Sequence, residues 1–438
     1  MNLKNKNTLV LGLGKSGLAA VMLLLAQGAR VSVYDVSEDS KLQRTAEELR
    51  QKGVNVHLGD FALRPESYEL CVLSPGLDPR KPIVQNFYSA NVKIISEIEL
   101  ASWFASTQII AVTGTNGKST TTELIASALS AAGKKVIACG NLGLPFSEVV
   151  LKKSELDAVV LEVSSFQLEA IDSFRPNVAV HLNLSPDHLD RYDSFEHYRR
   201  TKLRIFENQE ANDLAIVNAN LELTQIKASQ VTFSSDSLKS HFSYKNQALF
   251  IGEKLFLRQN ETKLLGPHNA ENQLAAIAVT QNYEIDESII KNALIEYSPL
   301  AHRCQIVEVI EGVRYIDDSK ATNVDAMKKA ILAQQGEVIL IAGGKDKGVG
   351  FKSLIHVVEQ RVKKAVLIGQ TKHKIRTDWG DKVTCVLVDT LEKAVEEASM
   401  TAVRGDVVLL SPGCSSFDMF EGFEDRGKQF ANLVRKMT

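Results

Sequence analysis

The sharpest chemical signal in the sequence is the run GTNGKST at Gly114–Thr120, between the apolar run Ile109–Thr113 and a helical pattern. Glycines let backbone N–H groups turn toward phosphate oxygens, and the N-terminus of the following helix adds partial positive charge. In such a loop Lys118 would reach the outer phosphates of a nucleotide, and the Ser119 hydroxyl would bind Mg²⁺. ATP is favoured over GTP because no guanine-reading N-K-x-D motif follows. The alternative is a tight strand–helix turn that carries an exposed lysine.

A second glycine loop, GLGKSG at Gly12–Gly17, overlaps the end of the apolar run Thr8–Leu13, and Asp35 closes the next apolar run. This spacing is typical of a dinucleotide-binding βαβ unit, in which the loop binds a pyrophosphate and the acid meets a ribose or a base. Three interpretations are open: an NAD-dependent dehydrogenase, a site for a different diphosphate ligand, and a purely structural turn. A phosphate loop elsewhere in the same chain makes simple hydride chemistry less natural.

The elements that must position these loops are strands that alternate with helices. A third strand–glycine–helix unit is expected at Glu337–Ala342, followed by Gly343 and Gly344. Continuous Val/Ile/Leu runs are typical of parallel strands buried on both faces, so the pattern predicts doubly wound α/β sheets. The stretch 231–263 predicts small strands added to the central domain. Further strands are expected at Arg30–Tyr34, Val136–Ala138, Ala158–Glu162, Val178–Leu182, Ala365–Ile368, Val383–Val388 and Val407–Leu410.

Length and composition set the outer limits of the fold. The chain has 438 residues, which suggests about three domains. We expect boundaries near Ser96 and near Leu300, giving domains 1–96, 97–300 and 301–438. The net charge of −2 argues against a nucleic-acid partner. The longest apolar run, Leu18–Ala26, is too short for a membrane span, and five scattered cysteines without a CxxC motif favour a reducing cytoplasm.

Further motifs follow the glycine loops in order along the chain. They are EVSSFQL at 162–168, NLSPDH at 183–188, GPHN at 266–269, HR at 302–303, DSKATN at 318–323 and SPGCSSFD at 411–418. The set resembles the Mur ligase family, which adds amino acids to the peptidoglycan precursor; folylpolyglutamate synthases look similar in the GTNGKST loop. DSKATN and SSFQL are similar to the branch that adds D-glutamate. The DYAHTP-like and DYAHHP-like runs of the branches that add diaminopimelate, lysine or alanine do not occur.

The resemblance implies a three-domain α/β fold. A Rossmann-type N-terminal domain would bind the UDP substrate, a central P-loop ATPase domain with a parallel sheet would bind ATP, and a C-terminal Rossmann-like domain would bind the amino acid. The enzyme implied is a cytoplasmic, monomeric ligase of cell-wall synthesis whose substrates are UDP-N-acetylmuramoyl-L-alanine, D-glutamate and ATP. Because a carboxylate is a poor electrophile, ATP would first convert it to an acyl phosphate, which the amine then attacks, releasing phosphate.

The first step brings two anions together, so cations must neutralise them. The resemblance implies two Mg²⁺ ions, the first held by Ser119 and Glu162 and the second by His188 and Lys202. In this family CO₂ carbamoylates the lysine at position 202, which gives an anionic oxygen ligand suited to a hard cation. Taken alone, His188 and Lys202 would be an ordinary packing histidine and a solvated lysine. The catalytic residues implied are Lys118, His188, Lys202, Arg303 and Lys320.

The resemblance also implies three sets of binding residues. For ATP they are Gly114, Thr115, Asn116, Gly117, Lys118, Ser119, Thr120, Asn269, Asn272, Arg303, Asp318 and Lys320. For the UDP substrate they are Gly14, Lys15, Ser16, Gly17, Asp35, Ser74, Pro75, Gly76, Asn141, Ser164, Gln167 and His188. For D-glutamate they are Thr322, Lys347, Ser416, Phe417 and Phe423, with Lys345 as a competing lysine. Alternatively, Asn269 would cap a helix and Arg303 would form an interdomain ion pair.

Two rivals of other classes remain. A dehydrogenase built on the first glycine loop leaves GTNGKST and DSKATN unexplained. A nucleotide-dependent switch built on the second loop leaves the N-terminal domain unexplained. Lys15 and Val36 depart from the residues that the family leads us to expect at the uracil end of the UDP site.

Overall fold

The computed structural model describes residues 1–152, 155–221, 223, 226–236 and 240–437. Contacts between Cα atoms divide the chain into two compact units. The first contains residues 1–184 and 199–297, and the second contains residues 185–198 and 298–438. The segment 185–198 therefore belongs with the C-terminal part of the chain, although in sequence it lies between two strands of the central sheet.

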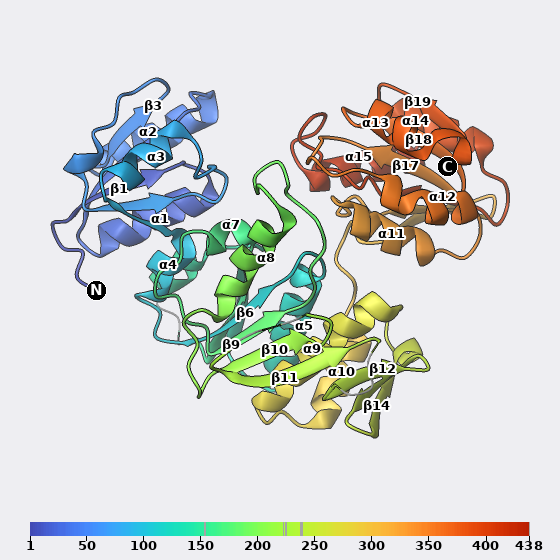
Figure 1. The fold of residues 1–438 in the computed structure, drawn as a ribbon, viewed down its shortest axis with the longest axis horizontal. Helices are drawn as coiled ribbons and strands as arrows, with labels where there is room; N and C mark the ends of the chain where they lie inside the picture. The colour runs from blue at the N-terminus through green and yellow to red at the C-terminus, as the bar shows by residue number, and fades with distance from the viewer. Residues whose placement is uncertain (153–154, 222, 224–225, 237–239, 438) are drawn as a thin grey trace. The chain divides into compact units, whose positions relative to one another are not determined.

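The N-terminal sheet has five parallel strands in the order β3-β2-β1-β4-β5 (Figure 1). They are β1 (Asn7–Leu11), β2 (Arg30–Asp35), β3 (Asn55–Leu58), β4 (Leu70–Leu73) and β5 (Lys93–Ser96). The helices are α1 (Lys15–Ala26), α2 (Ser40–Gln51) and α3 (Pro82–Ser89). Val10 of β1 packs with α1 and α2, whereas Leu9 packs with α3, so helices cover both faces. The Rossmann-type first domain predicted from the sequence is confirmed.

The central sheet has nine strands in the order β14-β13-β12-β11-β10-β9-β6-β8-β7. The parallel strands are β6 (Gln108–Thr113), β7 (Val136–Gly140), β8 (Ala158–Glu162), β9 (Val178–His181), β10 (Leu214–Asn218), β11 (Ser229–Ser234) and β12 (Phe242–Lys245). An antiparallel edge of β13 (Ala248–Ile251) and β14 (Lys254–Arg258) follows. It corresponds to the small strands expected in 231–263, of which residues 237–239 lie outside the described residues.

Helices cover both faces of the central sheet. They are α4 (Glu97–Ser102), α5 (Lys118–Ala131), α6 (Phe146–Leu151), α7 (Ser165–Leu168), α8 (Phe195–Leu203), α9 (Pro267–Asn282) and α10 (Glu287–Glu296). Because successive strand residues point to opposite faces, Val112 and Val180 pack in one cluster with α5 and α9. Ala111 and Ala179 pack in the other cluster with α6 and with Phe206, which follows α8. The phosphate loop thus lies at the end of a strand that is buried on both faces.

The C-terminal sheet has six strands in the order β15-β16-β20-β17-β18-β19, parallel except for β15. They are β15 (Gln305–Ile310), β16 (Val313–Asp317), β17 (Val338–Gly343), β18 (Val362–Ile368), β19 (Cys385–Leu387) and β20 (Val407–Leu410). The helices are α11 (Val324–Leu332), α12 (Ile355–Arg361), α13 (Lys372–Trp379), α14 (Leu391–Thr401) and α15 (Phe423–Arg435).

The α/β class with mainly parallel sheets is confirmed, and the strands Ala158–Glu162 and Val407–Leu410 have the predicted bounds. The third strand–glycine–helix unit differs from expectation, because after β17 the chain runs as a loop through residues 344–351 before a 3₁₀ turn and α12. This longer loop carries Lys345 and Lys347. None of the described helices is both long enough and apolar enough to cross a bilayer.

Candidate active site

The GTNGKST run forms the turn between β6 and α5, as its sequence predicts. Gly117 has a φ of +86°, and a Cβ atom there would lie 2.1 Å from Oδ1 of Asn272, so only glycine fits. The Asn183 side chain accepts the Asn116 N–H at 2.9 Å, which fixes the middle of the loop. Ser119 and Thr120 are buried in the first turn of α5.

The Lys118 ammonium folds back onto its own loop. Its Nζ donates to the carbonyl oxygens of Gly114 at 3.0 Å and Thr115 at 2.9 Å. A half-buried cation beside a helix N-terminus is suited to phosphate oxygens, because the N–H groups and the ammonium all favour negative charge. The arrangement can therefore hold the phosphates of a nucleotide.

Glu162 closes β8 directly beside the phosphate loop strand. Its register partner on β6 is Val112, so its carboxylate belongs to the same sheet edge as the loop. The carboxylate is 2% exposed, and its Oε1 accepts a hydrogen bond from Asn141 Nδ2 at 2.7 Å. Asn141 and Glu162 are therefore hydrogen-bonded to each other, although the resemblance assigns Asn141 to the UDP substrate and Glu162 to a metal. A buried carboxylate and the Ser119 hydroxyl are donors of the hard-oxygen type that Mg²⁺ prefers.

Lys202 lies near the end of α8 and is 2% exposed. Its Nζ donates to the Gly114 carbonyl oxygen at 2.8 Å, the same carbonyl that Lys118 contacts. Two lysines thus converge on one oxygen at the start of the phosphate loop. This position rules out the ordinary reading of Lys202 as a solvated helix lysine, because a fully solvated ammonium would be exposed.

Asn269 and Asn272 lie on one side of α9, as their spacing predicts. Asn272 Nδ2 donates to Asn269 Oδ1 at 3.3 Å, and Asn272 Oδ1 accepts from the Thr121 hydroxyl at 3.2 Å. The alternative that Asn269 caps the helix is wrong, because α9 begins at Pro267 with Gly266 as its N-cap residue. Asn269 Nδ2 instead donates backward to the Leu265 carbonyl oxygen at 2.9 Å.

The N-terminal glycine loop also has the predicted strand–turn–helix geometry. Gly12 has a φ of +92°, and a Cβ atom at Gly17 would lie 1.9 Å from the Gly12 carbonyl oxygen. The Asp35 carboxylate accepts the N–H groups of Leu13 at 2.6 Å and Ser37 at 2.9 Å. Asp35 therefore organises the loop itself. Ser74, Pro75 and Gly76 follow β4 at the same edge, since Ser74 N–H donates to the Leu11 carbonyl oxygen.

Ser164 and Gln167 have a structural role that the sequence analysis did not assign. Ser164 Oγ accepts the Gln167 N–H at 3.3 Å, and Gln167 Oε1 accepts the Ser164 N–H at 2.9 Å. These reciprocal bonds form a capping box at the N-terminus of α7. The sequence signal was the S-x-x-Q spacing itself.

In the C-terminal unit, the DSKATN run directly follows β16, and hydrogen bonds from other segments hold its first residue. The Asp318 carboxylate accepts the Ser411 hydroxyl at 2.7 Å and the Cys304 N–H at 3.2 Å. Burial raises the pKa of Asp318 to about 7, against the opposing effect of these hydrogen bonds and of Arg303. Lys320 lies 3.7 Å from the centroid of the Phe423 ring, which is a cation–π contact.

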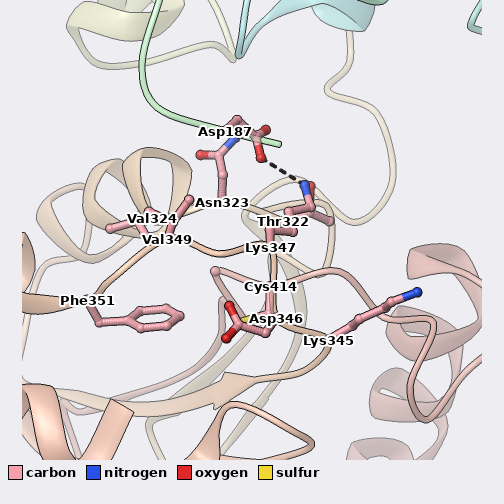
Figure 2. Close-up of a pocket in the computed structure, with 11 residues that line it drawn as sticks. Asp187, Thr322, Asn323, Val324, Lys345, Asp346, Lys347, Val349, Phe351 and Cys414 are labelled. Atoms are coloured by element: carbon pink, nitrogen blue, oxygen red, sulfur yellow. Dashed lines mark hydrogen bonds and ion pairs between the residues drawn. The ribbon is translucent and has the colours of Figure 1, made fainter. Parts of the chain in front are cut away.

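A small pocket in the same unit brings together residues from four separate segments (Figure 2). Lys347 Nζ donates to Asp187 Oδ1 at 3.0 Å, and Asn323 Nδ2 donates to Asp187 Oδ2 at 3.3 Å. Burial opposes ionisation of Asp187, but Lys347 and His188 outweigh it and hold its pKa below the usual value. The pocket is lined by Asp187, Thr322, Asn323, Val324, Lys345, Asp346, Lys347, Val349, Phe351, Gly413 and Cys414.

The pocket contains only part of the set expected for D-glutamate. Thr322 and Lys347 line it, whereas Ser416, Phe417 and Phe423 are not among its lining residues. Phe417 is 67% exposed, while Ser416 is buried. Lys345 lines the pocket too, but its ammonium points away from Asp187 in Figure 2. Sequence reasoning gave no role to Asp187 here, because nothing in the spacing links position 187 to position 347.

His188 has a left-handed backbone, with a φ of +55°, and its N–H donates to Asp187 Oδ1 at 2.9 Å. Its ring lies 6.3 Å from the ring of Tyr198. Among the described residues, no three His, Cys, Asp or Glu side chains come together as a ready metal site.

Comparison with known proteins identifies the family of the chain. The N-terminal domain of MurD-like Mur ligases matches residues 6–96, the Mur ligase middle domain matches 112–280, and the Mur ligase glutamate ligase domain matches 302–414. Two relatives are named UDP-N-acetylmuramoylalanine–D-glutamate ligase. The protein of Koribacter versatilis is 40% identical over 449 residues, covering 100% of this chain and 99% of the relative. That of Caldanaerobacter subterraneus is 39% identical over 445 residues, covering 99% of each.

Solved structures show the same fold. UDP-N-acetylmuramate–alanine ligase MurC from Thermotoga maritima matches with a TM-score of 0.64 and 19% identity, covering 99% of this chain and 100% of that one. The MurF ligase from Thermotoga maritima, solved in complex with ADP, matches with a TM-score of 0.61 and 17% identity, covering 100% and 96%. Since the relatives near 40% identity span the full length, the chain belongs to the Mur ligase family.

Proposed function

We propose that this protein is an ATP-dependent ligase that joins D-glutamate to UDP-N-acetylmuramoyl-L-alanine in peptidoglycan precursor synthesis. The observation that carries the proposal is the full-length match, at 39–40% identity, to relatives named for that reaction. The phosphate loop with Lys118, and the pocket with Thr322 and Lys347, supply the two kinds of site that the reaction requires.

The three parts of the chain take three substrates in this proposal. Residues 1–96 bind the UDP substrate, residues 97–300 bind ATP, and residues 301–438 bind D-glutamate. The nucleotide in the complex of the related MurF structure is ADP, which is the product that ATP would leave here. Asp35 orders the N-terminal loop, because its carboxylate accepts the Leu13 and Ser37 N–H groups. In this proposal the ordered loop binds the nucleotide end of the UDP substrate.

The chemistry begins with activation of the L-alanyl carboxylate. One carboxylate oxygen attacks the γ-phosphorus of ATP, the bond to the β–γ bridging oxygen breaks, and ADP leaves. The amine of D-glutamate then attacks the carbonyl carbon of the acyl phosphate, loses a proton to solvent, and displaces inorganic phosphate. Lys118 leaves the carbonyl oxygens of Gly114 and Thr115 to bind the phosphates, where it offsets charge that shifts during transfer. Arg303, Lys320 and Asp318 complete the nucleotide site.

We further propose two Mg²⁺ positions, with Ser119 and Glu162 at the first and His188 and carbamoylated Lys202 at the second. When bound, Mg²⁺ neutralises phosphate charge. Lys202 becomes a suitable ligand when its neutral amine attacks the carbon of CO₂. A nitrogen–carbon bond forms, one proton passes to solvent, and the product carries one negative charge. The burial of Lys202 supports the proposal, because an unmodified lysine cation at a buried position costs free energy.

For the amino acid, we propose that Lys347 binds one carboxylate of D-glutamate and that Thr322 lies beside it. Ser416, Phe417 and Phe423 extend the site in this proposal. Lys347 is preferred over Lys345 because its ammonium lies inside the pocket and already binds a carboxylate, that of Asp187.

The test is a substrate panel with the full-length protein. Purified protein is mixed with ATP, Mg²⁺ and UDP-N-acetylmuramoyl-L-alanine, and only the amino acid is varied among D-glutamate, L-glutamate, L-alanine, L-lysine and meso-diaminopimelate. We expect phosphate release and a new amide product with D-glutamate alone, and no phosphate release without the UDP substrate. Equal ATP hydrolysis without the UDP substrate would instead favour a nucleotide switch.

A further inference from the structure

The last residue of β9 is a histidine that is completely buried. His181 is 0% exposed, and among the described residues neither ring nitrogen has a hydrogen-bond partner. A buried imidazole without partners is costly, since each unsatisfied polar group loses its hydrogen bonds to water. An apolar residue would fill this place in the sheet at lower cost. The histidine therefore needs an explanation beyond packing.

The direction of the His181 ring follows from the strand. Ala179 lies two residues earlier and packs in the cluster that contains Phe206, whereas Val180 packs in the cluster on the opposite face. The ring of His181 stacks on Phe206, with centroids 6.4 Å apart and planes 28° from parallel. Since Phe206 follows α8, the His181 ring lies on the face of the sheet that also carries the end of α8.

Lys202 approaches the same place from the helix. It lies four residues before Phe206, and its Nζ donates to the Gly114 carbonyl oxygen. Gly114 directly follows Thr113, which is the register partner of His181 on β6. Lys202 and His181 therefore lie at the same end of β6, and both side chains are buried.

We propose that His181 is a positioning residue for Lys202, and that its ring N–H donates a hydrogen bond to an oxygen of the carbamate that forms on Lys202. The inference rests on the carbamoylation proposed above. In the unmodified protein the lysine head binds a carbonyl oxygen, and the imidazole has no partner among the described residues. Addition of CO₂ places two acceptor oxygens on the Lys202 side chain, and one of them accepts the hydrogen bond from the His181 ring N–H.

The chemistry of the ring fits this role. Burial disfavours the charged form of the His181 ring, so the ring is neutral and carries one donor N–H. A neutral donor stabilises the carbamate anion without adding a positive charge that would compete with Mg²⁺ for it. Hydrogen bonds to charged groups contribute more than those between neutral groups, so one such bond shifts the CO₂ equilibrium measurably.

The experiment measures the carbamate directly. The full-length protein is equilibrated with ¹³C-labelled bicarbonate, and the carbamate signal is followed by ¹³C NMR as dissolved CO₂ increases. Lys202→Ala identifies the signal. His181→Phe keeps a ring against Phe206 but removes the donor, His181→Leu is a smaller apolar variant, and His181→Gln restores a donor. Thermal unfolding without CO₂ is measured for each variant.

We expect the CO₂ concentration at half-maximal signal to rise on the order of tenfold in His181→Phe and His181→Leu, and to stay near the wild-type value in His181→Gln. Unfolding temperatures should not fall in the apolar variants, because an unsatisfied polar group has been removed. Unchanged CO₂ dependence in both apolar variants would overturn the positioning role. Absence of any Lys202 carbamate in wild-type protein would overturn it together with the proposed modification, whereas the substrate panel tests the ligase reaction independently.

Discussion

The phosphate loop and the C-terminal pocket hold their central lysines in opposite ways. Lys118 donates to two neutral backbone carbonyl oxygens of its own loop, and it remains half-buried. Lys347 is paired with a carboxylate, that of Asp187, in a pocket where Asp187 is 4% exposed. When Lys118 moves to an incoming phosphate, the carbonyl oxygens that it leaves are neutral, so no unpaired charge remains in the loop. A buried carboxylate that gives up its lysine is left as an unpaired anion, which costs far more.

The same residue type is therefore prepared for its ligand to different degrees at the two sites. The phosphate loop needs only backbone geometry and one cation, and each of these is local in sequence. The pocket carries an internal anion in contact with the very lysine proposed to bind substrate. Variants of the two lysines should therefore differ in stability as well as in activity.

The largest effect is expected for Lys118→Ala. Turnover should fall about 10³-fold, because the ammonium offsets charge that moves between the phosphates. The free energy of unfolding should change by less than about 0.5 kcal/mol, since the Gly114 carbonyl oxygen keeps its hydrogen bond from Lys202 and no charge is left unpaired. Steady-state kinetics and urea unfolding of the same preparation measure both quantities. A large loss of stability would remove the distinction between the two lysines.

Lys347→Ala should act on both binding and stability. We expect the KM for D-glutamate to rise on the order of 50-fold, with little change in the KM for ATP, because one charged contact to a carboxylate is lost. The free energy of unfolding should fall by about 3 kcal/mol, since the buried Asp187 carboxylate loses its lysine partner. Kinetics with varied D-glutamate and urea unfolding report the two effects.

Lys345→Ala is the matched control for this variant. Lys345 lies two residues earlier in the same loop, is exposed, and points away from Asp187. Its removal should leave both the KM for D-glutamate and the stability near their wild-type values. A larger effect on the D-glutamate KM from Lys345→Ala than from Lys347→Ala would move the proposed carboxylate contact to Lys345.

Much of the fold could be predicted because its signals are local. The strand–glycine–helix runs at β1 and β6 are visible as continuous apolar residues followed by glycines, and the structure has both units. The short strands β3 and β10 were not predicted. Asn55–Leu58 mixes polar and apolar residues, and Leu214–Asn218 was not distinguished from its surroundings. Their place in the sheet depends on pairing with distant strands, which a single sequence does not display.

A part of the candidate site could be predicted from the sequence only where all of its residues lie within one motif. Gly117 and Lys118 are such a case. By contrast, the contacts of Lys347 with Asp187 and of Lys202 with Gly114 join positions far apart in sequence. The extended loop after β17 was also missed, because two glycines after a strand are equally typical of a short turn and of a longer loop.

Asp318 is a buried carboxylate of another kind, because its hydrogen bonds come from neutral donors. Its pKa is raised to about 7 by burial, whereas its ordinary value is 3.8. The folded protein thus retains this proton while the unfolded chain loses it, so stability falls as pH rises from about 4 to about 7. Asp318→Asn should lack this loss and be more stable than wild type by about 2 to 4 kcal/mol at about pH 8. Urea unfolding across this range gives the comparison, and parallel curves for the two proteins would contradict it.

Apart from the Lys345 control, the smallest effect is expected for Asp187, because burial and pairing oppose each other there. Lys347 and His188 outweigh burial, so the folded-state pKa lies below the ordinary value of 3.8. The resulting stabilisation is present above the unfolded-state pKa and is lost as pH falls through the folded-state pKa, opposite in sign to Asp318. Asp187→Asn should therefore be less stable than wild type by about 1 to 2 kcal/mol near neutral pH, and this difference should shrink below about pH 4. Urea unfolding of both proteins at a series of pH values measures it. A difference that stays constant down to the acid limit would mean that the ion pair with Lys347 contributes no net stability, and the contrast between the pocket lysine and the phosphate-loop lysine would then fail.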